Sequence, residues 1–312
     1  MTDEIDPDIR AFLSRTSADY AQLSHGEELD LARRRAVAER VREPWTSGGP
    51  TMAATETLTV EPFSTRIRIH RPTDAGPLPA LVYLHGGGWT LFSIDTHDRL
   101  MREYAARSGC AVVGVDYSLS PEVRFPVALD EAQAVCAWLG EHGAAHGIDA
   151  GRLALGGDSA GANLALSTAL RLRDAGRDAA ALLLNYGAFD TVERASHARF
   201  DGDRFMLTVP EMAAFWENYL GPDGAAREHP LARPMLADLH GLPPAFLCIA
   251  ECDILADENR VMADRLRDAG VNVTATVYPG ATHSFLEAVE ISALADRALG
   301  EAADWLRGRL AS

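Results

Sequence analysis

The 312 residues suffice for one elaborate domain or two modest ones, and a hydrophobic content of 47% can supply a large core. A formal net charge of -16 repels nucleic acid and anionic membrane surfaces at long range. We therefore expect a neutral or cationic small molecule as the partner, with no nucleic acid and no membrane. The acidic N-terminal segment lacks a leader pattern, and no window of about 18 apolar residues occurs, which predicts a soluble, cytoplasmic protein.

Four cysteines occur in apolar runs of the chain, at Cys110, Cys136, Cys248 and Cys252. They are too few, and too embedded in apolar sequence, to indicate the disulfide scaffold of a secreted protein. We expect reduced and mostly buried thiols.

The first part of the chain has a helical pattern. An apolar stripe runs from Ile9 to Leu23, and residues 27–42 are dense in Ala, Leu, Arg and Glu. Pro44 is expected to stop the helix, because proline lacks an N–H and disfavours helical backbone in the residue before it. A Ser-Gly-Gly-Pro linker follows at 47–50. This pattern predicts an N-terminal arm that is separable from the rest.

Strand and helix patterns then alternate. Polar and apolar residues alternate between Glu56 and Arg71, as in strands half exposed to water. Later candidates are continuous apolar runs, typical of strands buried on both faces, followed by one further strand. They are residues 80–84, 111–115, 153–155, 181–184 and 245–250, then 271–278. Because helical segments separate them, we predict an α/β fold with a mostly parallel, eight-stranded sheet flanked by helices.

One segment of some forty residues, from Asp190 to about Arg233, interrupts this alternation. Its apolar helical face is formed by Met212, Phe215, Trp216, Tyr219 and Leu220. Ordinary helix packing is one interpretation of this face. The other is a lid over the binding site, built together with the N-terminal arm.

The motif Gly-Asp-Ser-Ala-Gly at residues 157–161 stands between an apolar run and an Ala- and Leu-rich helical segment. Strand, tight turn and helix with Ser159 at the apex match the G-x-S-x-G nucleophile elbow. Its glycines lack Cβ atoms, so that strand and helix can approach closely around a strained serine backbone.

A serine nucleophile of this kind needs hydrogen-bond donors for the oxyanion, a base and an acid. The sequence His-Gly-Gly-Gly-Trp at 85–89 follows a buried strand, and this pattern accompanies the elbow in lipases and esterases. We predict that the backbone N–H groups of Gly86, Gly87 and Ala160 form the oxyanion hole. A merely flexible glycine loop is the alternative.

The acid and the base are expected after later strands. Asp253 lies just past an apolar run and is the predicted acid, with Asp257 or Glu251 as alternatives. His283 follows the last strand and a Pro-Gly turn, and is the predicted base. The order Ser159, Asp253, His283 matches nucleophile, acid and base in α/β-hydrolases, whereas an isolated loop histidine is normally just a surface residue.

No cofactor or metal is expected. Neither a P-loop nor a G-x-G-x-x-G dinucleotide motif occurs in the sequence. His142 and His146 have the spacing of a metal-binding pair, but glycines at 140, 143 and 147 argue against a stable helix there.

These motifs together resemble the hormone-sensitive-lipase family of α/β-hydrolases, from about Leu81 to the C-terminal helix. The resemblance rests on the paired HGGG and GDSAG motifs, on VDYSLSPE at 115–122 with Phe-Pro at 125–126, and on Tyr-Pro-Gly at 278–280. It implies the triad named above, activity on short acyl esters and, in many members, a dimer. A homodimer is therefore a possible assembly.

The resemblance also implies a helical cap formed by residues 1–50 and 190–230. The α/β-hydrolase catalytic domain would comprise residues 51–189 and 231–312. Candidates for the lining of the substrate pocket are Trp89, Asp158, Phe215, Trp216 and Tyr219.

The chain departs from the family pattern near the site. Ile254 and Ala256 stand where the family usually has proline and arginine, and Ser284 and Ala162 replace glycines. These changes affect local geometry and remove no catalytic group.

The predicted function is a serine carboxylic ester hydrolase that acts on short-to-medium acyl esters through an acyl-enzyme intermediate. An amidase or arylformamidase would use the same residues. A non-catalytic small-molecule receptor on this fold is the alternative from another class, although receptors typically lose a triad member.

Overall fold

The computed structural model describes residues 4–222 and 226–311. Residues 1–3 and 223–225, which belong to the two predicted cap segments, lie outside the described residues, as does residue 312. In the described chain, eight strands form one sheet in the order β1-β2-β4-β3-β5-β6-β7-β8. The strands are β1 (Ala54–Val60), β2 (Thr65–Arg71), β3 (Leu78–Leu84), β4 (Ala111–Asp116), β5 (Ile148–Asp158), β6 (Ala181–Asn185), β7 (Ala245–Cys252) and β8 (Val273–Thr282).

The sheet is mostly parallel, as predicted. β1 and β2 form an antiparallel hairpin, β2 pairs antiparallel with β4, and all remaining neighbours are parallel. Every residue of β7 is buried, because helices cover both faces of the sheet there. The four cysteines are buried thiols that form no disulfide among the described residues, as expected.

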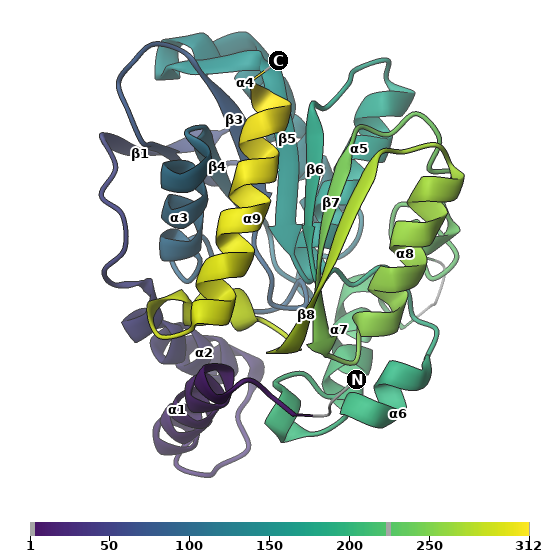
Figure 1. The fold of residues 1–312 in the computed structure, drawn as a ribbon. Helices are drawn as coiled ribbons and strands as arrows, with labels where there is room; N and C mark the ends of the chain where they lie inside the picture. The colour runs from purple at the N-terminus through teal and green to yellow at the C-terminus, as the bar shows by residue number, and fades with distance from the viewer. Residues whose placement is uncertain (1–3, 223–225, 312) are drawn as a thin grey trace.

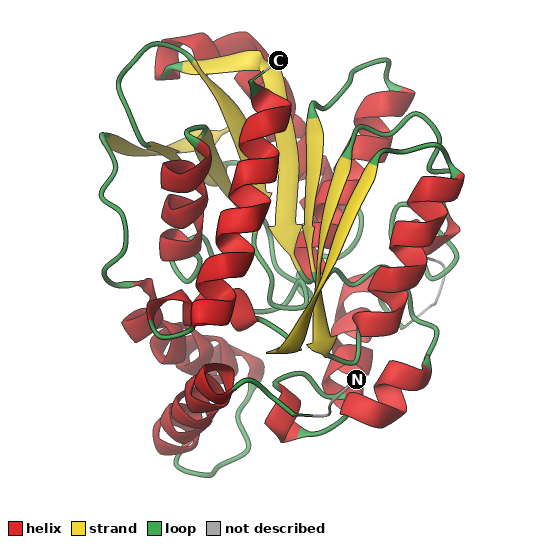
Figure 2. Ribbon diagram, viewed as in Figure 1, coloured by secondary structure: helices red, strands yellow, loops and turns green. Residues whose placement is uncertain are grey.

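Helices cover the sheet in two layers (Figures 1 and 2). The α-helices are α1 (Pro7–Ser24), α2 (Leu31–Thr46), α3 (Asp98–Ser108), α4 (Val127–His142), α5 (Ala160–Asp174), α6 (Ala195–Phe200), α7 (Val209–Leu220), α8 (Ala256–Asp268) and α9 (Ala293–Leu310). Short 3-10 helices are η1 (Gly143–His146), η2 (Asp203–Phe205), η3 (Pro234–Leu236) and η4 (Phe285–Glu290). Helices α3 and α9 pack together on one face, and α4 and α5 pack together on the other.

The N-terminal arm packs closely against the rest of the molecule. Helix α2 continues through Pro44 to Thr46, so the predicted stop at Pro44 is wrong. Trp45 is buried, and its ring meets Phe12 edge-on with centroids 4.7 Å apart. Burial of this large ring favours the continued helix, although Pro44 removes one hydrogen-bond donor. Ile9 and Phe12 expose no surface, so the arm is not separable from the core in this structure.

The carboxyl ends of the parallel strands point toward the end of the molecule where α1, α2, α6 and α7 gather (Figure 1). Ligand sites in open α/β sheets lie at this end of the strands. The four helices come from the two segments predicted to form the cap, residues 1–50 and 190–230.

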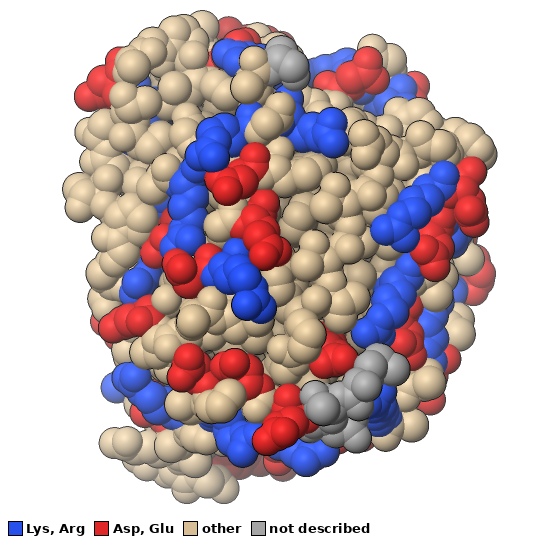
Figure 3. All heavy atoms as spheres, in the orientation of Figure 1, with Lys and Arg blue, Asp and Glu red and all other residues tan. Residues whose placement is uncertain are grey.

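The chain contains no lysine, so every basic side chain drawn blue in Figure 3 is an arginine. Arginines and carboxylates are interspersed over the face shown in Figure 3. Many arginines of the described chain form ion pairs, such as Arg107 with Glu103 and Asp296. Within residues 4–222 and 226–311, none of the helices combines the length and apolarity needed to cross a membrane.

Candidate active site

Ser159 occupies the turn between β5 and α5, with φ 53° and ψ -119°. A positive φ is unfavourable for a residue with a Cβ, so the serine backbone is strained as the elbow motif predicts. A Cβ on Gly157 or on Gly161 would overlap the carbonyl oxygen of Leu84. Both glycines of the motif are therefore sterically required where the helix crosses the neighbouring strand.

Ser159, His283 and Asp253 form a continuous hydrogen-bonded chain. His283 Nε2 lies 2.9 Å from Ser159 Oγ, and His283 Nδ1 lies 2.7 Å from Asp253 Oδ2. The other carboxylate oxygen of Asp253 accepts the backbone N–H of Leu255 at 3.0 Å. Asp253 directly follows β7 and His283 directly follows β8, so the parallel strand ends bring together side chains that are distant in sequence.

The environment of His283 favours its protonated form. Burial alone would lower the pKa of His283, but the charge and hydrogen bond of Asp253 outweigh burial and raise that pKa above 6.5. The ring of Tyr186 meets the imidazole edge-on, with centroids 5.1 Å apart. The imidazole is thus fixed in position and electrostatically prepared to take up a proton.

The alternative acids lie elsewhere. Glu251 accepts the backbone N–H of Gly280 at 3.2 Å, and Asp257 accepts that of Ser196 at 2.8 Å. Within the described residues neither carboxylate is hydrogen-bonded to His283.

The glycine loop after β3 differs from its prediction at one residue. The Gly86 N–H donates to Asp158 Oδ1 at 3.1 Å, so the prediction that this amide lines the oxyanion hole is wrong. The loop instead turns with positive φ at Gly87 (108°) and Gly88 (59°), where side chains are disfavoured. Among the described residues, the N–H groups of Gly87, Gly88 and Ala160 have no hydrogen-bond acceptor.

Asp158 lies beneath this loop and is almost fully buried, so its predicted place in the pocket lining is corrected. Its Oδ1 accepts the Tyr83 hydroxyl at 2.8 Å as well as the Gly86 N–H, and its Oδ2 lies 3.3 Å from His97 Nε2. Burial would raise the pKa of Asp158, but the charge of His97 more than offsets it and lowers that pKa. The other ring nitrogen of His97 lies 2.9 Å from Thr96 Oγ1.

Sequence reasoning missed Gly88, Tyr83 and His97. Gly88 is the third glycine of the motif, so it was visible in the sequence as a candidate donor. It becomes preferable to Gly86 only when the Gly86 N–H is known to be hydrogen-bonded to Asp158. Tyr83 and His97 carry no local signal, because only their contacts with Asp158 reveal them.

The aromatic residues predicted to line the pocket pack against one another. Trp89 stacks on Tyr219 with centroids 4.3 Å apart and lies 4.5 Å from Trp216. Phe215 covers Gly88 so closely that a Cβ there would overlap its ring. All four aromatic side chains are buried. Their contacts are those of α7 packing on the glycine loop: Trp216 and Tyr219 contact Trp89, and Phe215 covers Gly88.

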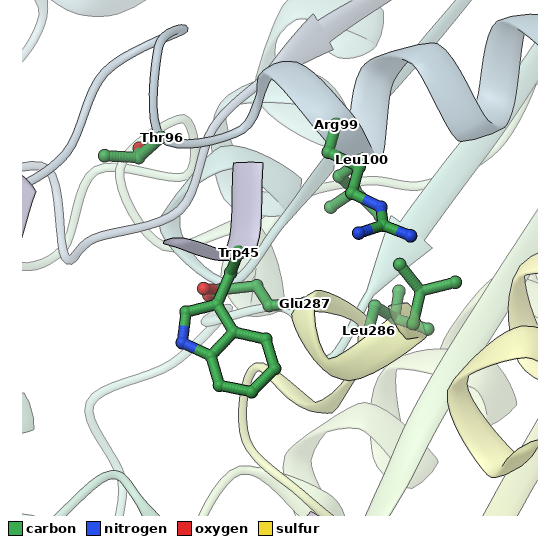
Figure 4. A pocket seen from close by; sticks show the side chains of 7 residues that line it. Trp45, Thr96, Arg99, Leu100, Leu286 and Glu287 are labelled. Atoms are coloured by element: carbon green, nitrogen blue, oxygen red, sulfur yellow. The ribbon is translucent and has the colours of Figure 1, made fainter. Parts of the chain in front are cut away.

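Two cavities border the N-terminal arm, and neither of them borders Ser159. The larger, of about 190 Å³, lies between α2 and the loop before α3 and is lined by Glu39, Arg40, Glu43, Thr46, Asp95 and Thr96. The smaller, of about 10 Å³, includes Trp45 and Glu287 in its lining (Figure 4).

His142 and His146 have separate partners. His142 Nδ1 lies 3.2 Å from the Trp138 carbonyl oxygen, and His146 Nδ1 lies 3.0 Å from Glu56. The part of the chain that the structure describes holds no group of three or more His, Cys, Asp or Glu side chains arranged to bind a metal ion.

Comparisons with known proteins agree with this architecture. A family profile described as alpha/beta hydrolase fold matches residues 81–287. An acetyl esterase of Salmonella paratyphi A is 35% identical over 276 residues, which cover 86% of this chain and 84% of that protein. A hyperthermophilic esterase from the archaeon Pyrobaculum calidifontis superposes with a TM-score of 0.90 at 33% identity, covering 99% of this chain and 100% of its own. An ester-hydrolase from the Lake Arreo metagenome, solved with a bipyridine phosphonate derivative, has the same TM-score at 34% identity, covering 99% and 100%.

Fold, site geometry and relatives define the class of the protein as a carboxylesterase-type hydrolase with the α/β-hydrolase fold. Within that class, the chain belongs to the hormone-sensitive-lipase family of esterases.

Proposed function

We propose that the protein hydrolyses small carboxylic esters with short-to-medium acyl groups, using Ser159 as nucleophile, His283 as general base and Asp253 as the acid that orients it. The observation that carries this proposal is the unbroken chain from Asp253 through His283 to Ser159 Oγ, with contacts of 2.7 and 2.9 Å. Such a chain, ending at a serine on a strained elbow, is the arrangement that activates a hydroxyl group for acyl transfer.

In the first step, Ser159 Oγ attacks the ester carbonyl carbon while its proton moves to His283 Nε2. The Nδ1–H of His283 donates to Asp253, which holds the neutral ring in the tautomer that accepts this proton. Asp253 then stabilises the imidazolium that forms, in keeping with the raised pKa of His283. The imidazolium gives its proton to the departing alcohol, which leaves the acyl group on Ser159.

The negative charge on the carbonyl oxygen needs donors that are in place before the reaction. We assign this role to the N–H groups of Gly87, Gly88 and Ala160, which have no acceptor among the described residues. Asp158 supports the assignment, because it anchors Gly86 at the start of the loop. The positive φ values at Gly87 and Gly88 give the backbone turn that a residue with a Cβ would resist.

The second step removes the acyl group. A water molecule gives a proton to His283 Nε2 as its oxygen attacks the acyl carbon, and the same three amides stabilise the second oxyanion. The carboxylic acid then leaves, and Ser159 recovers its proton from His283. The alcohol thus carries away the proton that Ser159 lost, and the water molecule supplies the proton that replaces it.

A preference for short acyl groups is supported by two observations. Phe215 covers Gly88, so a bulky aromatic ring lies beside the proposed oxyanion hole. The similar Salmonella protein is named as an acetyl esterase. A panel of p-nitrophenyl esters of increasing chain length tests this preference, and we expect kcat/KM to be highest for short chains.

Two organisational proposals accompany this function. Residues 1–50 and 190–230 form a cap over a catalytic domain of residues 51–189 and 231–312, supported by the position of α1, α2, α6 and α7 beyond the strand ends. A homodimer is proposed from the family resemblance alone, and size-exclusion chromatography with light scattering tests it directly.

Replacement of Ser159 by alanine tests the catalytic proposal. We expect Ser159→Ala to lower kcat for p-nitrophenyl acetate by about 10⁵-fold, because the covalent route is lost. Near-wild-type turnover by this variant would contradict the assignment. Matched anilide substrates distinguish the amidase alternative, since an esterase cleaves the ester far faster than the anilide.

A further inference from the structure

The loop that carries His283 is contacted by the N-terminal arm both before and after the histidine. We propose that the arm is a brace that positions His283 against Ser159, and that Arg42 and Glu287 are the positioning residues in it. This inference rests on the proposed role of His283 as the catalytic base. It assigns to the arm a function in the chemical step, in addition to any covering of the substrate.

The first contact precedes His283 and is made by the backbone. The Asp6 N–H donates to the Gly280 carbonyl oxygen at 3.0 Å, while the Gly280 N–H donates to Glu251 Oε2 at 3.2 Å. Gly280 has a φ of 78°, and a Cβ there would approach the Asp6 nitrogen to 2.8 Å. The backbone of Gly280, three residues before His283, is therefore held between the arm and the end of β7.

The second contact follows His283 and is a buried ion pair. Arg42 of α2 pairs through Nε with Glu287 Oε2, in an ion contact that lacks the alignment of a hydrogen bond. The side chains of Arg42 and Glu287 are only 9% and 7% exposed. The Glu287 N–H donates to the carbonyl oxygen of Ser284, the residue directly after His283, at 3.1 Å. A shift of Glu287 is thereby transmitted along a short turn to the catalytic base.

The same guanidinium also touches the other side of the active site. Arg42 lies over the ring of Phe92 at 4.9 Å, within cation–π distance. Phe92 packs against the glycine loop, since a Cβ on Gly87 would approach its ring to 2.8 Å. Arg42 is thus in contact with the segment beside the proposed oxyanion donors and with the segment that carries the base.

The interface between the arm and the His283 loop is closely packed. Trp45 of α2 and Glu287 of η4 lie beside each other at a cavity of about 10 Å³ (Figure 4). A space of that size holds about one water molecule at most. Close-packed interiors transmit small displacements, so a change at Arg42 will be felt at the loop.

The brace makes a prediction that a simple substrate lid does not. A lid contacts the substrate, so damage to it changes KM. A brace fixes the distance between His283 Nε2 and Ser159 Oγ, so damage to it lowers kcat at nearly constant KM. Misplacement of reacting groups by about 1 Å can cost up to about 100-fold in rate.

The test compares steady-state kinetics and stability of four variants of the full chain. Arg42→Met removes the charge and the pairing, Arg42→Lys keeps the charge on a different geometry, and Glu287→Gln keeps the shape and removes the carboxylate. Arg107→Met is the matched control, because Arg107 pairs with Glu103 and Asp296 between α3 and α9, away from the triad. All rates are measured with p-nitrophenyl acetate, well below the melting temperature of every variant.

We expect Arg42→Met and Glu287→Gln to lower kcat by about 10- to 100-fold, with KM within about twofold of wild type. Arg42→Lys should recover part of the loss, and Arg107→Met should keep the wild-type kcat. The downfield proton resonance of His283 Nδ1–H, hydrogen-bonded to Asp253, should shift or broaden in the first two variants only. If Arg42→Met fails to fold, Glu287→Gln decides the matter, since it preserves side-chain volume.

The proposed brace would be contradicted if Glu287→Gln and Arg42→Met had the same kcat as Arg107→Met. It would also be contradicted if these two variants changed only KM. Failure of the proposed function gives a different result, because Ser159→Ala would then retain the wild-type activity.

Discussion

The protein contains two buried histidine–aspartate pairs on either side of the nucleophile elbow. In one, His283 Nδ1 lies 2.7 Å from Asp253; in the other, His97 Nε2 lies 3.3 Å from Asp158. In both, the carboxylate raises the pKa of the histidine against the opposing effect of burial. The difference lies in what each pair holds: the first ends at the Ser159 hydroxyl and the second at the Gly86 amide.

The contrast indicates that the role of a histidine–aspartate pair depends on what the other imidazole nitrogen, the one that does not contact the aspartate, faces. In His283 this nitrogen is Nε2, which faces the Ser159 hydroxyl and can take its proton. Nδ1 of His97 instead faces the Thr96 hydroxyl, 2.9 Å away, and not a serine nucleophile. We therefore expect the first pair to act in proton transfer and the second to act through the shape of the glycine loop.

The largest expected effect comes from His283 and Asp253, the pair proposed to be catalytic. Asp253→Asn should lower kcat by about 10⁴-fold, because the amide favours the tautomer of His283 that cannot accept the Ser159 proton. The rate is measured with p-nitrophenyl acetate, and circular dichroism confirms the fold. A loss of less than tenfold would remove Asp253 from the triad.

Asp158→Asn should have a smaller effect, of about 10²-fold on kcat, because it loosens the Gly86 anchor and disturbs the neighbouring oxyanion donors. Binding of a trifluoromethyl ketone, which forms a tetrahedral oxyanion, should weaken in parallel while KM for the ester changes little. If kcat fell but binding of the ketone did not weaken, Asp158 would not act through the oxyanion hole.

His97→Leu should lower kcat by about tenfold, and His97→Gln, which keeps a donor for Asp158, should lower it less.

The pair of His97 and Asp158 also contributes to stability in a pH-dependent way. Burial lowers the pKa of His97 but the Asp158 charge raises it overall, so the stabilisation is complete below about pH 6.5 and is lost as pH rises through the folded pKa. The melting-temperature difference between wild type and His97→Gln should therefore shrink from pH 6 to pH 9. A difference that grows over this range would contradict the assignment.

The smallest effect is a shift of the pH profile. His283 must be neutral to accept the Ser159 proton, so kcat/KM falls as pH drops through the pKa of His283. Because Asp253 raises that pKa, we expect the acid limb of the wild type to be centred above pH 6.5. The residual activity of Asp253→Asn should have its acid limb at lower pH. If the acid limb of Asp253→Asn lay at the same pH as that of the wild type, a group other than His283 would control the loss of activity at low pH.

Much of the fold could be predicted from the sequence because its signals are local. Continuous apolar runs mark strands buried on both faces, and the glycines of the elbow are needed where a Cβ would meet the carbonyl oxygen of Leu84. The order of Ser159, Asp253 and His283 along the chain indicated that they meet, because each follows one of the parallel strands β5, β7 and β8, whose carboxyl ends lie at the same edge of the sheet.

What could not be predicted depends on contacts between distant segments. The Gly86 amide is engaged by Asp158, which lies 72 positions away, so Gly88, two residues after Gly86, becomes the better candidate donor. Helix α2 continues past Pro44 because Trp45 packs on Phe12. The pair of Arg42 and Glu287 joins the two ends of the chain and leaves no trace in local periodicity.

The central claim is that Ser159 is a nucleophile activated by His283. Reaction with a fluorophosphonate probe, followed by peptide mass spectrometry, tests it most directly. We expect one probe per chain on Ser159, no label in Ser159→Ala, and much slower labelling in Asp253→Asn. A label on another residue, or no label on the folded wild-type protein, would contradict it.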